Sequence, residues 1–137
     1  MKDILFKAKR LNSNIWVEGY YVKMNNSYFI YYDNEYSNGY VEIDPETLCQ
    51  FTGLIDKNKK EIWENDIVSA VWYSYTEPIE DITGRVIFDQ GWCAYVICDE
   101  SMKTKSELNG CGAYIYEFEV IGNVFDNPKL IYDEDYT

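Results

Sequence analysis

Apolar and polar residues alternate in short runs through the first third of the chain. Four segments show this pattern: "DILFKAKR" (3–10), "NIWVEGYYVKM" (14–24), "SYFIYYD" (27–33) and "NEYSNGYVEI" (34–43). A period of two is typical of a half-buried β-strand, whose side chains point alternately to the two faces of a sheet. The polar cluster "NNS" at 25–27 predicts a turn, and Asn38-Gly39 is a strong hairpin signal. We therefore expect three or four strands between about residues 3 and 43.

The pattern changes at "DPETLCQF", which predicts one short helix near residues 45–50. Asp44 is a good N-cap, Pro45 suits the first helical position, and Glu46 lies near the positive end of the helix dipole. Gly53 can end the helix, because glycine adopts the left-handed conformation at little cost. The span allows only a turn or two of α- or 3₁₀-helix.

The second half returns to strand patterns. "EIWENDIVSAVWYSY" (61–75) predicts one strand, or two joined by a bend at Asn65-Asp66. "ITGRVIFD" (82–89) and "WCAYVICD" (92–99) are joined by Gln90-Gly91, "SMKTKSELNGCG" (101–112) is loop-like, and "AYIYEFEVIGNVF" (113–125) resumes the alternation. Gly122-Asn123 suggests a bend or bulge within that last strand.

These elements predict a mainly β fold. Short, strongly bent strands often close into small barrels, and a five-stranded, SH3-like barrel fits residues 61–125. We expect an N-terminal β subdomain with the short helix at 1–52, and the barrel at 53–137 with a mobile acidic tail, together forming one unit.

The net charge of −12, from 24 acids and 12 bases, argues against direct binding of nucleic acid. The basic clusters, Lys7–Arg10 and Lys57–Lys60, are small, and Arg85 is the only base from Glu61 to Met102. Two interpretations of the charge stay open. It can serve solubility alone, or it can present an acidic surface to a basic partner as a mimic of DNA.

The four cysteines, Cys49, Cys93, Cys98 and Cys111, lack CxxC spacing, and the chain has no histidine, so the common zinc patterns do not fit. We expect free thiols in a reducing cytoplasm, with Cys93 and Cys98 in the core. The charged N-terminus does not resemble a signal peptide, and no apolar run is long enough to cross a membrane. We expect no cofactor and no metal site.

The absence of histidine also excludes Ser-His and Cys-His nucleophile pairs. Close carboxylates remain as candidates for acid–base chemistry or for binding a hard cation: Glu64 with Asp66, Glu80 with Asp81, and Glu117 with Glu119. In so acidic a chain, close acids are expected by chance, and solvated strand faces are the favoured explanation of such pairs. We expect no catalytic residues, and a carboxylate-based hydrolase is the least favoured function.

Aromatic residues make up 18% of the chain, and many gather between residues 16 and 40. Three interpretations stay open: alternate members form the core, others form a protein interface, or they form a platform on which bases stack. The acidic balance counts against the last. The candidate interface residues are Trp16, Tyr20, Tyr31 and Tyr36.

Two blocks of the sequence resemble the YopX-like proteins of phages and prophages. The first signature block is "QFTGLIDKNKKEIWENDIV" (50–68), and the second is "FEVIGNVFDNPKLI" (118–131). The segments "ILFKAKR", "WVEGYYV" and "VEIDPETLCQ" are also similar to family segments. The matching residues that we expect to be structural are Gly53, Leu54, Asp56, Asn58, Trp63, Glu64, Asp66, Gly122, Asn123 and Pro128.

This sequence departs from the family pattern at Lys59 and Asn65, where glycine is usual. Asparagine tolerates the left-handed conformation better than lysine, so we expect Asn58 to take the left-handed position in the first turn. We expect Asp66 to brace the bend between the two strands.

The resemblance implies a barrel-containing β fold, a phage or prophage origin, the cytoplasm of a bacterial host, and homo-oligomers. It implies no reaction. The favoured function is therefore a non-catalytic accessory protein that binds itself and another host or phage protein; the alternative is a DNA mimic that inhibits a host defence or DNA-binding protein.

Overall fold

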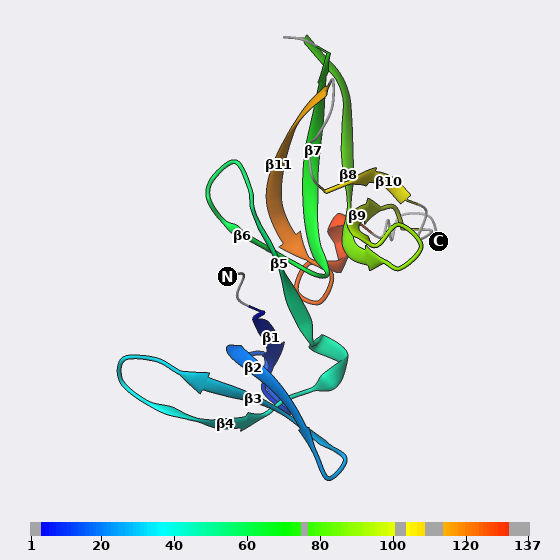
Figure 1. The fold of residues 1–137 in the computed structure, drawn as a ribbon. Helices are drawn as coiled ribbons and strands as arrows, with labels where there is room; N and C mark the ends of the chain where they lie inside the picture. Colours follow the sequence, from blue (N-terminus) through cyan, green and yellow to red (C-terminus); the bar gives the residue numbers. More distant parts are fainter. Residues whose placement is uncertain (1–3, 75–76, 101–103, 109–113, 132–137) are drawn as a thin grey trace. The chain divides into compact units, whose positions relative to one another are not determined.

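The structure, a computed structural model, describes residues 4–74, 77–100, 104–108 and 114–131 (Figure 1). The fold is mainly β and divides into two compact units, the N-terminal unit Met1–Gly53 and the C-terminal unit Leu54–Thr137. The sequence-based division between residues 52 and 53 falls next to this boundary. In the part of the chain that the structure describes, no helix is long and apolar enough to span a bilayer.

The N-terminal unit is an antiparallel sheet with the strand order β4-β3-β2-β1-β5 (Figure 1). Its elements are β1 (Phe6–Lys9), β2 (Trp16–Met24), β3 (Ser27–Asp33), β4 (Asn38–Glu42), the 3₁₀ helix η1 (Pro45–Thr47) and β5 (Cys49–Ile55). β5 continues past the boundary into the C-terminal unit, whose first strand of its own is β6 (Glu61–Trp63).

Period-two alternation builds the core of the N-terminal unit. Ala8, Ile30 and Ile43 are fully buried, and apolar side chains from three strands and the loop before β5 pack against them: Phe6, Val17, Tyr21, Tyr28 and Leu48. Tyr21 and Tyr28 stack at 6.3 Å between ring centroids. The prediction that alternate aromatic residues face the core is therefore confirmed for these two tyrosines.

The predicted short helix is confirmed as η1. The Asp44 carboxylate accepts a hydrogen bond from the Glu46 N–H at 3.0 Å, and Pro45 occupies the first turn. The predicted end at Gly53 is wrong, because the helix ends at Thr47 and Gly53 lies within β5 with a φ of 84°. Glycine is needed there for a left-handed residue inside a strand.

Two hairpins connect β2, β3 and β4. Asn25 and Asn26 both have positive φ and form the predicted turn between β2 and β3. The hairpin predicted at Asn38-Gly39 exists, but its turn lies earlier, because Asn38 pairs with Asp33 inside the β3–β4 ladder. The side chain of Asn34 closes the loop instead, accepting the N–H groups of Tyr36 and Ser37 at 2.9 and 3.0 Å.

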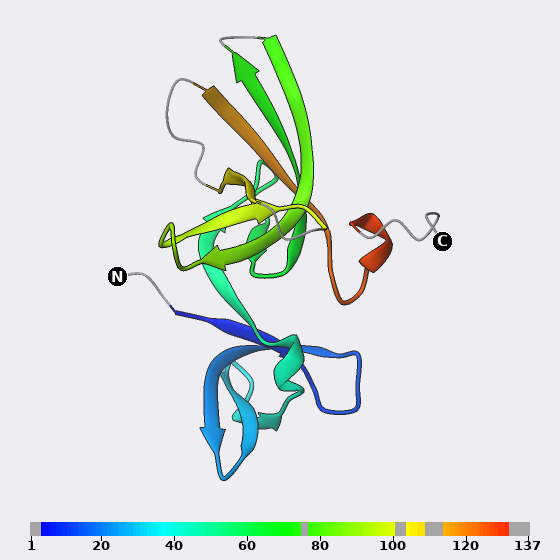
Figure 2. The ribbon, with the colours of Figure 1, turned by 90° about the vertical axis from the view of Figure 1, so that its right-hand side faces the viewer.

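The C-terminal unit contains a second antiparallel sheet with the order β10-β9-β8-β7-β11 (Figure 2). The elements of the unit are β6, β7 (Asp66–Ser74), β8 (Glu77–Asp89), β9 (Ala94–Cys98), β10 (Thr104–Glu107), β11 (Tyr114–Asn123) and the 3₁₀ helix η2 (Pro128–Leu130). The long strand β8 pairs with β7 along most of its length and with β9 from Arg85 onward.

The predicted closed barrel does not appear in the described residues. Each of the two sheets stays open, since β10 and β11 form the two edges of the second sheet and no ladder between them is present in the described segments. β10 has only four residues, which already pair with β9 through an irregular register. The core of this unit is nevertheless dense, with Ile62, Val68, Ala70, Ile82, Val86, Ile97 and Leu108 buried together.

Other local predictions have mixed outcomes. The two strands joined at residues 64–65 are confirmed, as are the β8–β9 hairpin and the bulge before Gly122, where the register shifts after Val120. The loop predicted at 101–112 contains β10. Cys98 is buried as expected, but Cys93 is exposed because it lies in the β8–β9 turn with a φ of 53°. The acidic tail at 132–137 lies outside the described residues.

Gly19 and Gly39 provide a test of the N-terminal sheet. A Cβ at Gly19 would overlap the carbonyl oxygen of Tyr31, whereas at Gly39 the nearest atom is the hydroxyl oxygen of Tyr32 at 3.2 Å. We expect Gly19→Ala to lower the free energy of unfolding by about 2–3 kcal/mol, because backbone must move. Gly39→Ala should change it by less than about 1 kcal/mol, since a side-chain tip can shift. Urea unfolding measures both, and equal effects would contradict the close approach of β2 to β3.

Candidate functional site

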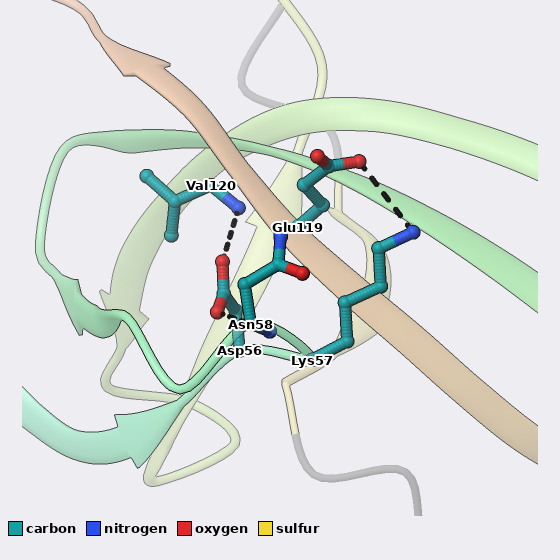
Figure 3. Close-up of polar contacts among 5 residues, drawn as sticks. All are labelled: Asp56, Lys57, Asn58, Glu119 and Val120. Atoms are coloured by element: carbon teal, nitrogen blue, oxygen red, sulfur yellow. Dashed lines mark hydrogen bonds and ion pairs between the residues drawn. The ribbon is translucent and has the colours of Figure 1, made fainter.

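Hydrogen bonds join the two signature blocks of the sequence within the C-terminal unit (Figure 3). The N–H of Lys57 donates to the carbonyl of Phe118 at 2.9 Å. The N–H of Val120 donates to Asp56 Oδ2 at 2.9 Å, as Figure 3 shows. A third bond runs from the N–H of Val124 to the carbonyl of Asn65 at 3.0 Å. The blocks lie some sixty residues apart in sequence and form one continuous structural joint, which we call the signature joint.

The carboxylate of Asp56 is the centre of the signature joint. Its Oδ1 accepts the N–H of Asn58 at 2.8 Å, and its Oδ2 accepts that of Val120 (Figure 3). Oδ1 also accepts the N–H of Lys60 at 2.8 Å. Burial, to 6% exposure, acts to raise the pKa of Asp56, but the three N–H donors and the Lys60 charge outweigh it. The net result is a pKa below the ordinary value of 3.8, so the group is a carboxylate near neutral pH.

The turn from Asp56 to Lys60 differs from the prediction. The left-handed residue is Lys59, with a φ of 64°, and the expectation that Asn58 would take this conformation is wrong. The Asp56 carboxylate accepts the N–H of Asn58 and the N–H of Lys60, and the N–H of Lys59 donates to the Asp56 carbonyl at 3.0 Å. These bonds fix the turn so that the left-handed position falls on the lysine.

A second tight turn joins β6 to β7. Asp66, 3% exposed, accepts the N–H of Trp63 on Oδ2 at 2.8 Å, and Asn65 has a φ of 69°. The side-chain oxygen of Asn65 accepts both Nε and Nη2 of Arg85, at 3.1 and 2.7 Å, and its N–H donates to the Val86 carbonyl at 2.7 Å. Asn65 therefore links the turn to β8, which glycine at this position could not do through a side chain.

The second signature block forms a compact turn after β11. Asn123 Oδ1 accepts the N–H groups of Phe125 and Asp126 at 3.0 and 2.9 Å, and Pro128 begins η2. A Cβ at Gly122 would lie 2.6 Å from Asn127 Oδ1, so a larger residue there would displace the Asn127 side chain, which accepts the N–H of Asn123. These contacts hold the end of β11 in place.

The remaining signature residues occupy varied surroundings. Trp63 is buried at 4% exposure, Leu54 is partly exposed at 38%, and Asn58 lies in the exposed turn. Glu64 is half-buried; burial together with the Glu64 charge raises the pKa of Tyr95 to about 12. The signature side chains of Asp56, Asp66 and Asn123 accept backbone N–H groups and so stabilise the fold.

Two members of the three candidate carboxylate pairs have defined partners in the described side chains. Asp66 bonds the backbone, and Glu119 forms an ion pair with Lys57 at 3.6 Å, with both side chains 44% exposed (Figure 3). Such an exposed pair contributes about 0–1 kcal/mol to stability. The side chain of Glu80 lies outside those described. In the described residues, no group of three or more acids and cysteines is placed to hold a metal ion.

Cys49, Cys93 and Cys98 are free thiols, and Cys111 lies outside the described residues. Burial raises the pKa of the Cys98 thiol, with Arg85 opposing the shift and Asp99 and Asp89 adding to it. A buried thiol with a raised pKa stays protonated and is a poor nucleophile.

The N-terminal unit carries a row of three tyrosines on the sheet face opposite its core. Tyr20 lies opposite Tyr31 in the β2–β3 ladder, and Tyr31 lies opposite Tyr40 in the β3–β4 ladder. Directly opposed residues share one face of a sheet. The rings of Tyr31 and Tyr40 lie 5.0 Å apart, and Phe29 meets Tyr40 edge-on at 6.5 Å. Tyr20 and Tyr40 are 52% and 59% exposed. We call Tyr20, Tyr31 and Tyr40 the tyrosine row.

The structure brings together three of the four predicted interface residues. Trp16 lies on the same strand and face as Tyr20, with the ammonium groups of Lys7 and Lys9 at 4.9 and 5.4 Å from its ring centroid. Tyr36 lies apart in the β3–β4 loop and is 92% exposed. Sequence reasoning did not select Tyr40, because its place in the row depends on the β3–β4 register, which the misplaced turn at Asn38-Gly39 concealed.

A cleft of about 590 Å³ lies in the same unit. The β2 segment 16–20 forms one wall, Tyr32, Asp33 and Asn34 at the end of β3 form another, and Arg10 adds a positive charge. Its lining mixes apolar side chains with three charged ones, Arg10, Glu18 and Asp33.

Asp56→Asn tests the signature joint. The variant should lose about 2–3 kcal/mol of unfolding free energy near pH 7, because an amide cannot replace the carboxylate toward three N–H donors. The pKa of Asp56 is lowered on folding, so its contribution is fully present above its ordinary pKa of 3.8 and is lost as the pH falls through the folded value. The difference between wild type and variant in urea unfolding should therefore shrink below about pH 4.

Asp81→Asn is the matched control, since Asp81 is an exposed carboxylate of the same unit. It should change stability by less than about 0.5 kcal/mol. A loss for Asp56→Asn that stays constant on acidification would contradict the role of its ionised form.

The two non-glycine residues of the first signature block with positive φ, Lys59 and Asn65, should respond oppositely to replacement by glycine. Lys59→Gly should raise the free energy of unfolding by about 0.5 kcal/mol, as relief of backbone strain exceeds the added flexibility of the unfolded chain. Asn65→Gly should lower it by about 1–3 kcal/mol, because the two hydrogen bonds from Arg85 to the Asn65 side-chain oxygen are lost. Thermal and urea unfolding of both variants provide the measurement, and stabilisation by Asn65→Gly would refute the link to β8.

The sequence matches the family described as "YopX protein" over residues 3–132. No curated protein matches the chain significantly. The match spans both units and includes both blocks of the signature joint. The chain belongs to the YopX family.

Proposed function

We propose that this chain is a non-catalytic phage or prophage accessory protein that works in the cytoplasm of a bacterial host by binding another protein. The observation that carries the proposal is the tyrosine row, with two of its three rings more than half exposed on an open sheet face. Tyrosine and tryptophan are enriched at protein interfaces, where a large ring contributes contact area at low entropic cost. Trp16 lies on the same face, and Trp16 and Tyr20 also line the cleft.

The signature joint supports the same conclusion from the other unit. Its hydrogen-bonded side chains, including Asp56 and Asn65, serve backbone N–H groups and Arg85. Because these signature residues stabilise the fold, we assign the function to a surface outside the signature joint. Self-association into a homo-oligomer and an SH3-like arrangement of the C-terminal strands belong to this proposal.

The alternatives have less support. A DNA mimic needs rows of carboxylates spaced like phosphates, whereas exposed acids of the described residues occur on both units, for example at Glu35, Glu42, Glu61 and Asp81. A hydrolase needs two cooperating carboxylates, and Glu119 is paired with Lys57.

Affinity capture from phage-infected host cells tests the proposal, with Tyr20→Ser/Tyr40→Ser as the variant and Trp92→Ser as the control. Trp92 is an exposed ring of the C-terminal unit, at 60% exposure. A partner captured by wild type and by the control should be reduced at least about tenfold by the double variant, since central tyrosines often contribute 1–2 kcal/mol or more each. Sedimentation velocity on all three proteins measures self-association.

Unchanged thermal unfolding of the double variant is required for this comparison. If the folded double variant captures the same partner as well as wild type does, the tyrosine row is not the interaction surface and the proposal is wrong.

A further inference from the structure

We infer that the partner bound by the N-terminal unit presents an extended segment with alternating basic side chains, which adds as a strand to the edge of β4 and lays its cations against the tyrosine row. This inference rests on the proposed function and specifies the chemistry of the partner.

The backbone of β4 offers hydrogen-bonding groups on its outer side. β4 is the edge of its sheet, with β3 as its neighbour. The carbonyl of Glu42 accepts the N–H of Leu11 at 3.0 Å, so the backbone groups of Glu42 point away from β3. Because this direction repeats every second residue, the N–H and C=O groups of Tyr40 and Asn38 also point outward. No bond to them from another backbone group occurs in the described part of the chain.

An added strand would continue the ladder at this edge. Extended peptides bind sheet edges through such main-chain bonds, and their alternate side chains contact the neighbouring surface and so determine specificity. Strands lie about 4.8 Å apart, so every second side chain of the segment would stand beside Tyr40 and the row behind it. The Leu11–Glu42 bond closes one end of the edge, which limits the added strand to a short segment along Asn38–Tyr40.

The charge around this edge favours basic side chains. Residues 24–56 contain six acids and no lysine or arginine. Arg10 pairs with Ile43 just beyond Glu42, at the end of the edge that the Leu11–Glu42 bond closes, so the open part along Asn38–Tyr40 belongs to the acidic hairpin. Two of the acids, Asp33 and Glu42, are exposed and lie two residues from Tyr31 and Tyr40 on the same strands, so they flank the tyrosine row on opposite sides. A cation above a tyrosine ring and beside a carboxylate gains from both the ring quadrupole and the charge.

The same sheet face already holds cations on an aromatic ring. Lys7 and Lys9 place their ammonium groups over Trp16. The geometry that the inference requires of the partner's side chains is therefore present within the unit itself.

The negative charge of the β3–β4 hairpin also disfavours pairing of this edge with the same edge of a second copy of the chain. Two copies of the β3–β4 hairpin would bring Asp33, Glu35 and Glu42 of one copy close to those of the other, with no base in either hairpin. Like charges at close range in paired strands are destabilising. The edge thus fits a basic peptide segment better than it fits itself.

A direct test uses a fluorescein-labelled peptide of eight residues, alternating arginine and valine, with fluorescence anisotropy on the full-length protein. Two matched peptides separate the contribution of the side-chain pattern from that of the main-chain hydrogen bonds. One has the same residues in two blocks, which removes the alternation. The other carries N-methyl groups on alternate residues, which removes N–H donors. We expect the alternating peptide to bind, and both matched peptides to bind at least about fivefold more weakly, as several main-chain bonds or ring contacts are lost.

Two double variants with equal changes in net charge test the location. Asp33→Asn/Glu42→Gln should weaken binding about fivefold, consistent with two charge contacts at an exposed surface. Glu61→Gln/Asp81→Asn, in the C-terminal unit, should leave it unchanged. If the two double variants weaken binding equally, or if the block peptide binds as tightly as the alternating peptide, the attraction is a general one to an acidic protein and the inference is wrong. A wild-type dimer that dissociates on Tyr40→Ser and excludes the peptide would overturn it in favour of self-pairing.

Competition separates this inference from the proposed function. If the partner captured through the tyrosine row is displaced by the alternating peptide, the inference holds. If capture depends on Tyr20 and Tyr40 but the peptide neither binds nor competes, the proposed function stands and the inference is wrong.

Discussion

The carboxylate of Asp56 accepts three backbone N–H groups, two from its own turn and one from β11. Each donor would otherwise be a buried or half-buried polar group without compensation for lost water, which costs about 1–3 kcal/mol. A single side chain thereby fixes the turn before β6 and the position of β11 beside it. The bonds from Lys57 to Phe118 and from Val124 to Asn65 extend this constraint along both segments. The C-terminal unit depends on a polar joint as much as on its apolar core.

The two units use their polar and aromatic side chains differently. In the C-terminal unit, Asp56, Asn65, Asp66 and Asn123 bind the backbone or Arg85 and so stabilise the fold. In the N-terminal unit, alternation places Tyr21 and Tyr28 against the core and leaves the tyrosine row on the opposite face. One pattern of residues makes a rigid framework, and the other makes a surface that can be bound.

Local chemistry was predictable from the sequence, whereas long-range pairing was not. The Asn25-Asn26 turn, η1 and the bulge before Gly122 follow from preferences of a few residues. The turn at Asn38-Gly39 was misplaced, because the Asn34 side chain closes the loop and the register of β3 and β4 moves the two residues into a strand. Barrel closure, the signature joint and the position of Tyr40 all depend on contacts between distant segments, which no local pattern encodes.

The lack of lysine and arginine from residue 24 to 56 has a practical consequence for mapping this surface. Trypsin has no cleavage site there, and reagents that couple to amines cannot label it, so conventional lysine crosslinking would leave the β3–β4 hairpin undetected even when a partner covers it. Its exposed phenols and carboxylates, with Tyr36 at 92% exposure, are instead open to nitration, iodination or carbodiimide coupling. Footprinting with those reagents would report on the surface that amine chemistry misses.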